Sequence, residues 1–216
     1  MSEPRFASVI LDVDSTLSGI EGIDWLAERR GAVVAAEVAR LTERAMDGAI
    51  TLDEVYDLRL QLVQPSRADC EQLGVAYKEA MAPGADLAIA RMQAAGVQVH
   101  LVSGGIRNAI LPFALTLGIT PNNVHAVDLV FDARGAYGNF NRTSPLATQT
   151  GKALVASWLD LQRPTLAVGD GATDAAMKQS IDTFSAFVGF VRRENVVRQA
   201  DMVFQSFDGI LRAVLT

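Results

Sequence analysis

One stretch near the start of the chain decides the fold: Phe6-Ala-Ser-Val-Ile-Leu-Asp-Val-Asp-Ser-Thr16. Its first six residues form a mainly apolar run that stops abruptly at Asp12. A short apolar run with such a boundary predicts a buried strand. Two carboxylates, those of Asp12 and Asp14, then stand at the carboxyl end of that strand.

Two later apolar runs also end in residues suited to chemistry. Residues 97–102 lead into Ser103-Gly104-Gly105, and residues 165–168 lead into Gly169-Asp170-Gly171. In sheets of parallel strands, ligands collect outside the carboxyl ends. A site is therefore expected where these three strands end.

Weaker strand candidates at residues 184–190 and 202–204 follow, and helical stretches lie between the runs. Residues 85–95 are one such stretch, with Gly96 in the position of a C-terminal cap. Short strands alternating with helices predict an α/β fold with a doubly wound, Rossmann-like parallel sheet.

Residues 18–78 break the alternation, because they contain helical signals and no convincing strand. Four helices joined by short connections predict a small bundle. We expect an inserted helical-bundle cap at residues 18–79, lying as a lid over a core formed by residues 1–17 and 80–216. The four expected helices span residues 23–30, residues 33–46, a segment from the capping box Thr51-Leu-Asp-Glu54 to about Val63, and a segment from Ser66 onward.

Two segments of the core are less regular. Pro112 falls within the helix expected after Ser103, so that helix should kink or restart there. Residues 124–137 alternate and turn at residues 133–135, which predicts an antiparallel hairpin beside the main sheet.

Composition narrows the classes of partner. Lys and Arg total 19 against 25 Asp and Glu, a net charge of −6, so no broad basic face is available for nucleic acid or an anionic membrane. Cys70 is the only cysteine and is expected to be a small buried hydrophobe. The first residues lack the apolar core of a signal peptide, and no apolar stretch approaches ~20 residues, so we expect a cytoplasmic protein. Oligomeric state cannot be deduced from these features.

Asp12 and Asp14 suit phosphoryl transfer. An aspartate side chain is an anion at neutral pH, so Asp12 can attack phosphorus without a base and form an aspartyl-phosphate. Asp14, if its pKa is raised by its acidic neighbour, can protonate the leaving group and later accept a proton from water. The Asp-x-Asp pair alone is a weak signal, since calcium loops, glycosyltransferases and surface turns also contain it.

Gly169-Asp-Gly-Ala-Thr-Asp174 brings two more acids to a second strand end. Four converging carboxylates would repel one another unless a cation binds among them, and oxygen ligands suit Mg²⁺. We expect Asp12 and Asp170 to bind through side chains and Asp14 through its carbonyl, with Asp174 orienting the ligands from behind. The alternative is that Asp170 and Asp174 cap the following helix.

Phosphate also requires donors. Ser103, Gly104 and Gly105 offer a hydroxyl and backbone amides at an expected helix N-terminus, where the dipole favours an anion. Lys152 begins another expected helix, at residues 153–161, where a lysine is mildly unfavourable for the dipole. That placement is understandable if Lys152 neutralises phosphate, although an exposed solubilising lysine is the alternative.

Taken in order, these motifs resemble the phosphoserine phosphatase family of the haloacid-dehalogenase superfamily. The resemblance covers nearly the whole chain. It implies Mg²⁺-dependent hydrolysis of O-phosphoserine to serine and phosphate, as in serine biosynthesis, with Asp12 as nucleophile and Asp14 as general acid and base. The matching segments are residues 12–16, 21–24, 44–46, 64–67, 102–105, 169–174 and 187–190.

The resemblance also assigns the substrate pocket. Glu21 would meet the ammonium, and Arg59, which interrupts an apolar helical stripe, would grip the carboxylate with two hydrogen bonds. Alternatively, Arg59 pairs with an acid of the cap such as Asp53 or Glu54. Met46, with Leu52, would wall the cavity, and Thr173 is assigned to substrate binding.

Other functions stay open. This chain has Asp47 and Leu52 where family members often have glycine and an aromatic residue. A sibling phosphatase acting on phosphoethanolamine or a phosphosugar is therefore the main alternative. A phospho-aspartate switch without turnover is disfavoured because such a module needs no helical insertion.

Overall fold

The computed structural model describes residues 3–46 and 50–216, with the side chains of residues 45, 46 and 52 left out. Its centre is a sheet of six parallel strands in the order β3-β2-β1-β6-β7-β8, which confirms the predicted doubly wound α/β fold. These strands are β1 (Ser8–Leu11), β2 (Gln98–Ile106), β3 (Val124–Val127), β6 (Thr165–Gly169), β7 (Thr183–Phe187) and β8 (Met202–Phe204).

Strand β1 lies in the middle of the sheet, where its four residues are buried. Leu11 pairs with Leu101 of β2 on one side and with Val168 of β6 on the other. Strands β1 and β6 therefore end at nearly the same level, beside the part of β2 that leads into Ser103. The backbone amide of Asp12 donates to the carbonyl of Val168 at 3.0 Å. This register brings the Asp-x-Asp motif beside Gly169 and Asp170.

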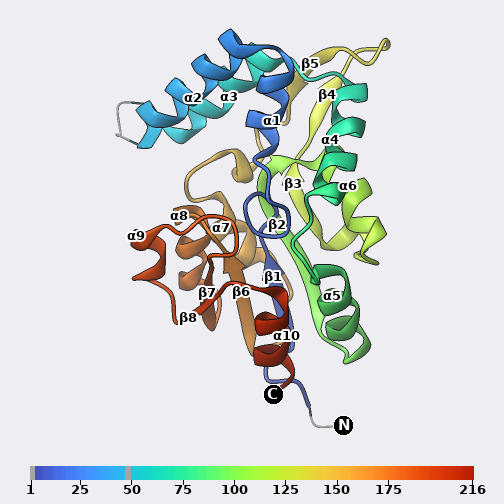
Figure 1. Ribbon diagram of the computed structural model, residues 1–216, viewed down its shortest axis with the longest axis vertical. Coiled ribbons are helices and arrows are strands. Elements are labelled where there is room, and N and C mark those ends of the chain that lie inside the picture. Colours follow the sequence, from blue (N-terminus) through green and yellow to red (C-terminus); the bar gives the residue numbers. More distant parts are fainter. Residues whose placement is uncertain (1–2, 47–49) are drawn as a thin grey trace.

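Helices flank the sheet, and α5 and α10 pack against each other at the lower end in Figure 1. Helix α5 ends at Ala94, and Gly96 follows in a left-handed conformation with φ 85°, as its capping role requires. The flanking helices are α5 (Ala85–Ala94), α6 (Arg107–Thr116), α7 (Gly151–Trp158), α8 (Ala172–Ala175), α9 (Glu194–Val197) and α10 (Phe207–Leu215), with 3₁₀ turns at Pro121–Asn123, Pro145–Ala147 and Ala176–Gln179.

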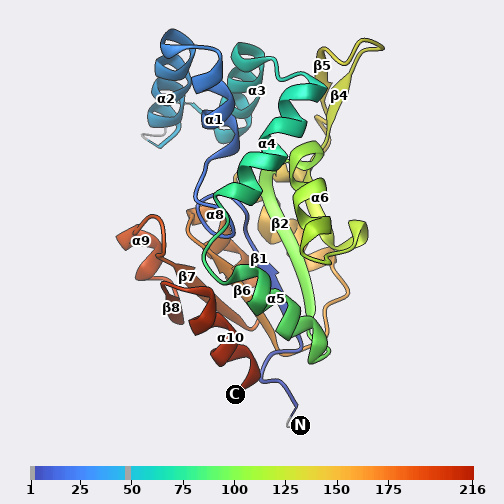
Figure 2. The ribbon, with the colours of Figure 1, turned by 45° about the vertical axis from the view of Figure 1, so that its right-hand side comes forward.

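Four helices lie between β1 and α5 in the chain, and the first three of them lie together beyond the carboxyl ends of the strands (Figures 1 and 2). The expected capping box of Thr51 and Glu54 is present at the start of α3, and a second box, formed by Ser66 and Asp69, begins α4. Whereas α1 to α3 pack on one another, α4 runs back toward the sheet and packs along α6. Their bounds are α1 (Gly22–Arg29), α2 (Ala32–Met46), α3 (Leu52–Val63) and α4 (Arg67–Glu79).

The structure corrects three expectations. Strand β2 continues through Ser103-Gly104-Gly105 to Ile106, where its pairing with β3 shifts register, so these residues do not form a helix N-terminus. Helix α6 runs through Pro112 without restarting. Residues 124–127, expected in the hairpin, form β3 of the parallel sheet instead.

The hairpin itself is formed by β4 (Leu129–Phe131) and β5 (Tyr137–Phe140). It reaches up beside α3 and α4 (Figures 1 and 2). Just beyond β5, Arg142 donates to both carboxylate oxygens of Asp57 in α3, at 2.8 and 2.9 Å. The guanidinium of Arg67 in α4 lies over the ring of Phe131. The hairpin thus links two of the four helices to the core.

Among the described residues, no helix combines the length and apolar character that a membrane crossing needs. The buried core runs continuously from the sheet into α1, α3 and α4, with Leu26, Leu60 and Leu73 fully enclosed.

We predict that Gly151→Ala destabilises the fold. A methyl group at Gly151 would overlap the backbone carbonyl of Pro145, which cannot move as a flexible side chain would. Overpacking of this kind costs about 1–3 kcal/mol or more in the free energy of unfolding, measurable by urea denaturation. The matched control is Gly209→Ala in α10, where the methyl group meets only ordinary contacts and the helix gains up to about 1 kcal/mol. Equal stability of the two variants would contradict this account of Gly151.

Candidate active site

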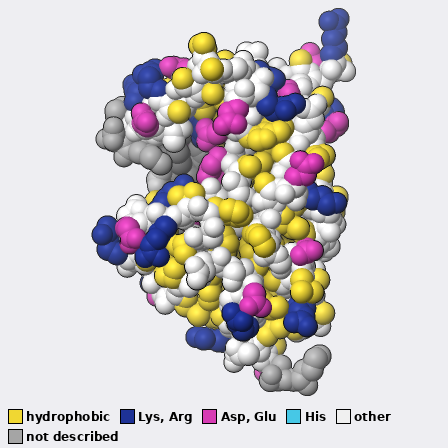
Figure 3. Space-filling model, viewed as in Figure 1, with side chains coloured by type: hydrophobic (Ala, Val, Ile, Leu, Met, Phe, Trp, Pro, Cys, Tyr) yellow, Lys and Arg dark blue, Asp and Glu magenta, His cyan; other side chains and the backbone are white. Residues whose placement is uncertain are grey.

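A cavity of about 870 Å³ lies between the strand ends and the helices above them. In Figure 3, acidic side chains line the indentation between the upper helices and the sheet. The floor comes from the core, through Asp12, Ser103 and Lys152, and the roof comes from Glu21 and from α3. Residues from far-apart segments of the chain thus line one cavity.

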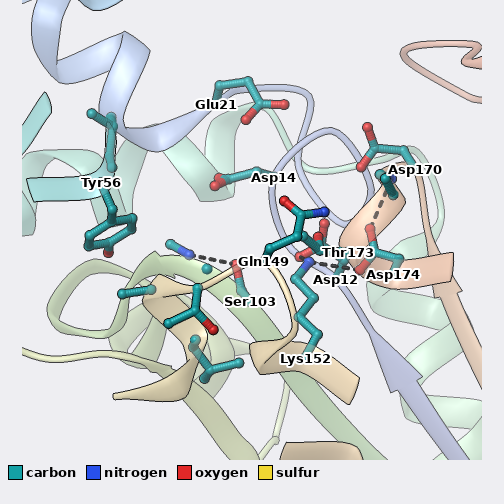
Figure 4. A pocket seen from close by; sticks show the side chains of 18 of the residues that line it. Asp12, Asp14, Glu21, Tyr56, Ser103, Gln149, Lys152, Asp170, Thr173 and Asp174 are labelled. Carbon is teal, nitrogen blue, oxygen red and sulfur yellow. Dashed lines mark hydrogen bonds and ion pairs between the residues drawn. The ribbon is translucent and has the colours of Figure 1, made fainter. Parts of the chain in front are cut away.

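Lys152 is the central cation of this cavity. It lies in the first turn of α7, is only 6% exposed, and places its Nζ 2.6 Å from Asp12 Oδ1 and 2.7 Å from Asp174 Oδ1 (Figure 4). Burial alone would lower the pKa of Lys152, but the two carboxylates raise it above its ordinary value. Lys152 is therefore a fixed positive charge, which excludes the exposed solubilising lysine.

Asp12, Asp170 and Asp174 form a compact group of buried carboxylates. One oxygen from each lies within 4.8 Å of the others. Asp170 also accepts a hydrogen bond from Thr16 Oγ1 at 3.2 Å, and Asp174 Oδ2 accepts one from the backbone amide of Gly171 at 2.9 Å. Hard oxygen ligands with surplus negative charge fit a divalent cation, so the residues present suit one.

Asp174 thus caps the short helix α8, as the alternative interpretation proposed, while its other oxygen pairs with Lys152. The two interpretations are compatible for this residue. Asp170, by contrast, faces the cavity with Asp12.

Asp14 occupies a different environment from Asp12. Its Oδ1 accepts hydrogen bonds from Tyr77 OH at 2.6 Å and from the backbone amide of Gly22 at 3.2 Å. Burial, and then the charges of Glu21 and Asp12, raise the pKa of Asp14 well above its ordinary value. A raised pKa keeps a proton on Asp14 that a neighbouring group in the cavity can receive.

Glu21 stands at the end of the segment that leads from β1 to α1. Ser15, which adopts φ 52°, turns the chain and donates from its Oγ to Glu21 Oε1 at 2.7 Å. The Glu21 carboxylate lines the cavity on the side of the helices, opposite Ser103 and Lys152 (Figure 4).

Ser103, Gly104 and Gly105 all line the cavity floor. The backbone amide of Gly105 donates to Ser103 Oγ at 3.0 Å. A Cβ at Gly105 would lie 3.2 Å from Asp14 Oδ2, so the absence of a side chain there lets the strand approach that carboxylate closely.

Arg59 points from α3 into the cavity and is tethered at one end. Its Nη2 donates to Asp24 Oδ1 in α1 at 2.8 Å. Arg59 therefore does pair with an acid of residues 18–79, as the alternative expected, but that acid is Asp24 and not Asp53 or Glu54. The buried Nε of Arg59 has no hydrogen-bond partner within residues 3–46 and 50–216. Arg59 therefore keeps a donor available for an anionic ligand.

Of the remaining residues assigned to the site, one lines the cavity and the others cannot be placed in it. Thr173 lines the cavity beside Asp12 (Figure 4). The side chain of Met46 and the whole of Asp47 lie outside the described residues, as does the side chain of Leu52, so their assignments stay predictions.

The cavity residues that the sequence analysis missed include Tyr56, Gln149 and Arg193. Arg193 forms ion pairs with Asp170 and, at 3.8 Å, with Glu21 Oε1. No motif marks Arg193 or Gln149, and Tyr56 fits the apolar stripe of α3.

Comparison with known proteins agrees with this geometry. The family model of the haloacid dehalogenase-like hydrolases matches residues 9–179. Phosphoserine phosphatase of Rattus norvegicus is 37% identical over 207 residues, covering 94% of this chain and 91% of the rat protein. The chloroplastic phosphoserine phosphatase of Arabidopsis thaliana is 34% identical over 212 residues, covering 96% and 71%. A solved phospho-aspartyl intermediate analogue of phosphoserine phosphatase is 25% identical with a TM-score of 0.79, covering 96% of this chain and 98% of that one.

Arg193 gives a prediction about charge balance. Arg193→Ala removes the guanidinium that pairs with Asp170 and Glu21. The free energy of unfolding without added metal should therefore fall by about 1–2 kcal/mol. This is less than for a fully buried ion pair, because Arg193 is partly exposed. A divalent cation should then raise the melting temperature more than in wild type, since Arg193 no longer competes for Asp170.

The neighbouring variant Arg192→Ala is the control, because within residues 3–46 and 50–216 the ion pair of Arg192 is with Glu194, on the surface. It should change neither stability nor the response to cations. If both variants respond to cations as wild type does, Arg193 does not compete for the acidic group.

Proposed function

Because the chain belongs to the haloacid dehalogenase-like hydrolases, we propose that it is a Mg²⁺-dependent phosphomonoester hydrolase acting on O-phosphoserine. One observation carries the choice of substrate. The cavity places an anion, Glu21, on the side opposite the Asp12–Lys152 pair (Figure 4). It is also lined by a cation, Arg59 of α3, whose Nε has no partner among the described residues.

Phosphoserine carries three charged groups, and the cavity offers a partner for each. The phosphate fits the floor, where Lys152 supplies positive charge and Ser103 supplies a hydroxyl. The ammonium fits Glu21, and the carboxylate fits Arg59, whose planar guanidinium binds carboxylates well. An ester lacking one of these groups would leave a buried charge without its partner, which is costly.

The proposed reaction has two chemical steps. In the first, a carboxylate oxygen of Asp12 attacks phosphorus, the bond to the serine oxygen breaks, and that oxygen takes a proton from Asp14. In the second step, a water molecule gives a proton to Asp14 and attacks the phosphorus of the aspartyl-phosphate. The bond between phosphorus and the Asp12 oxygen then breaks, so that phosphate is released and the Asp12 carboxylate is restored. The raised pKa of Asp14 supports this role, because the acid must hold a proton when the serine oxygen leaves.

Lys152 and Asp174 assist both steps by holding charged groups in position. Lys152 holds the Asp12 side chain by an ion pair and faces the phosphate with positive charge. Asp174, fixed by Gly171, holds Lys152 in turn. Removing the side chain of Lys152 or of Asp174 would therefore misplace the attacking oxygen of Asp12.

The divalent cation we propose is Mg²⁺, held by the side chains of Asp12 and Asp170 and by the carbonyl of Asp14. When bound, it would supply positive charge to the phosphoryl oxygens. The three clustered carboxylates support this assignment.

We also propose that residues 18–79 act as the cap that excludes water, with the core formed by residues 1–17 and 80–216. The roof position of Glu21, Tyr56 and Arg59 supports that division. The compartment we propose is the cytoplasm, where a chain whose only cysteine is buried Cys70 needs no disulfide.

A panel of small phosphomonoesters assayed with Mg²⁺ tests the substrate. We predict the highest kcat/KM for O-phosphoserine, above phosphoethanolamine, which lacks the carboxylate, and above phosphosugars, which lack both charges. A higher kcat/KM for either competitor would move the function to that sibling activity, whereas absence of turnover with every ester would remove the phosphatase assignment.

We predict that Arg59→Ala lowers kcat/KM for O-phosphoserine about 10- to 100-fold, the effect of losing a charge-assisted hydrogen bond of about 1.5–3 kcal/mol. Hydrolysis of an aryl phosphate should change little, because it has no carboxylate for Arg59 to bind. Arg67→Ala, which removes a guanidinium from the outer contact with Phe131, is the control and should leave both substrates unaffected. Equal losses on both substrates would remove Arg59 from the carboxylate site.

A further inference from the structure

Tyr56 is a polar residue in the roof of the cavity that the proposed reaction does not use. It lies on α3 one turn before Arg59, and both residues line the cavity. In Figure 4 its ring hangs from the helix, with the hydroxyl at the end farther from α3.

The hydroxyl of Tyr56 is buried without a partner. The residue is only 6% exposed, and its OH makes no hydrogen bond to any residue that the structure describes. Burying a hydroxyl in this way costs about 1–3 kcal/mol, and phenylalanine would fill the same space without that cost. A ligand that bonds the hydroxyl explains why it is there.

The ring is held in place independently of the hydroxyl. The rings of Tyr56 and Phe140 pack edge to face, with centroids 5.3 Å apart and planes at 63°. Phe140 belongs to β5 of the hairpin, which is also joined to α3 through the ion pair of Arg142 with Asp57. The hydroxyl is thus presented on a rigid support, as specific recognition requires.

The neighbours of the hydroxyl indicate the charge of its ligand. Burial raises the pKa of Tyr56 above its ordinary value, so the hydroxyl stays protonated and can donate. Arg59 lies one turn away on the same helix. Its Nη2 donates to Asp24, whereas its Nε has no acceptor among the described residues. Two adjacent donors that lack acceptors fit an anion with several acceptor positions, as a carboxylate has.

We propose that the Tyr56 hydroxyl is a specificity-determining hydrogen-bond donor to the substrate carboxylate, acting beside Arg59. The inference rests on the proposed function, because that function brings a carboxylate to this part of the cavity. The phosphate is the less suitable acceptor, since its donors, Lys152 and Ser103, lie on the opposite floor.

Tyr56→Phe tests the proposal because it removes only the hydroxyl and keeps the ring against Phe140. We expect kcat/KM for O-phosphoserine to fall about 10-fold, the loss of one hydrogen bond to a charged group. Phosphoethanolamine retains the phosphate and the ammonium but lacks the carboxylate, so its kcat/KM should stay within about twofold.

Tyr137→Phe in the hairpin is the matched control, since it removes a tyrosine hydroxyl outside the cavity and should leave both substrates unaffected. A double-mutant cycle adds a second readout. Because both side chains would bind the same carboxylate, Tyr56→Phe should cost less in an Arg59→Ala background than in wild type. Without ligand, the melting temperature of Tyr56→Phe should lie above that of wild type, because the variant no longer buries a hydroxyl without a partner.

Three outcomes would overturn the inference. Unchanged kcat/KM for O-phosphoserine would mean that the hydroxyl does not contact it, and equal losses on both substrates would assign the hydroxyl to the phosphate or to the fold. If wild type shows no preference for O-phosphoserine over phosphoethanolamine, the proposed function fails and this inference fails with it. A preserved preference with no effect of Tyr56→Phe overturns the inference alone.

Discussion

The buried ion pairs of Lys152 are the interaction on which the rest of the site depends. Asp12 follows β1 and Asp174 lies in α8, and these two buried carboxylates would repel each other. Their ammonium partner at 2.6 and 2.7 Å offsets that repulsion and fixes both carboxylates. Buried pairs of this kind add little net stability, because desolvation opposes them, so their value lies in geometry.

The parallel sheet supplies that geometry. The register of β1 with β2 and β6 brings the ends of β1 and β6 beside Ser103 of the longer β2, so the acids, Ser103 and its glycines share one edge of the sheet. The helices above that edge close the space and add groups of the opposite character, such as Glu21 and Arg59. The residues proposed for catalysis and those proposed for substrate recognition therefore line the same cavity. Each group contains both acidic and basic side chains, so neither leaves a large unbalanced charge.

Much of this arrangement could be predicted from the sequence because strand ends are marked by abrupt changes in polarity. Asp12, Asp170 and Ser103 each follow an apolar run, and both capping boxes mark where helices begin. The length of strand β2 was underestimated, because the glycines at 104 and 105 predict the end of the strand. Here they sit in an irregular extension of the strand, with its pairing resumed at Ile106 and Val127.

Other features depend on contacts that no local pattern encodes. Arg193 reaches Asp170 and Glu21 from a loop beyond the last motif, and only the folded chain brings the three together. Tyr56 matches the apolar periodicity of α3, so the pattern conceals its hydroxyl, whose burial without a partner emerges only from the packing of Phe140 and the cavity. The acid that pairs with Arg59 is Asp24, on a neighbouring helix rather than on α3 itself.

The most direct measurement of the central claim is the position of the covalent phosphate. The enzyme would be mixed with O-phosphoserine carrying radiolabelled phosphorus, quenched in acid during turnover, digested and mapped by mass spectrometry. The geometry predicts label on Asp12, and none in Asp12→Asn. Turnover with label on another residue, or with wild-type activity retained in Asp12→Asn, would contradict the claim that the paired carboxylate at the end of β1 attacks phosphorus.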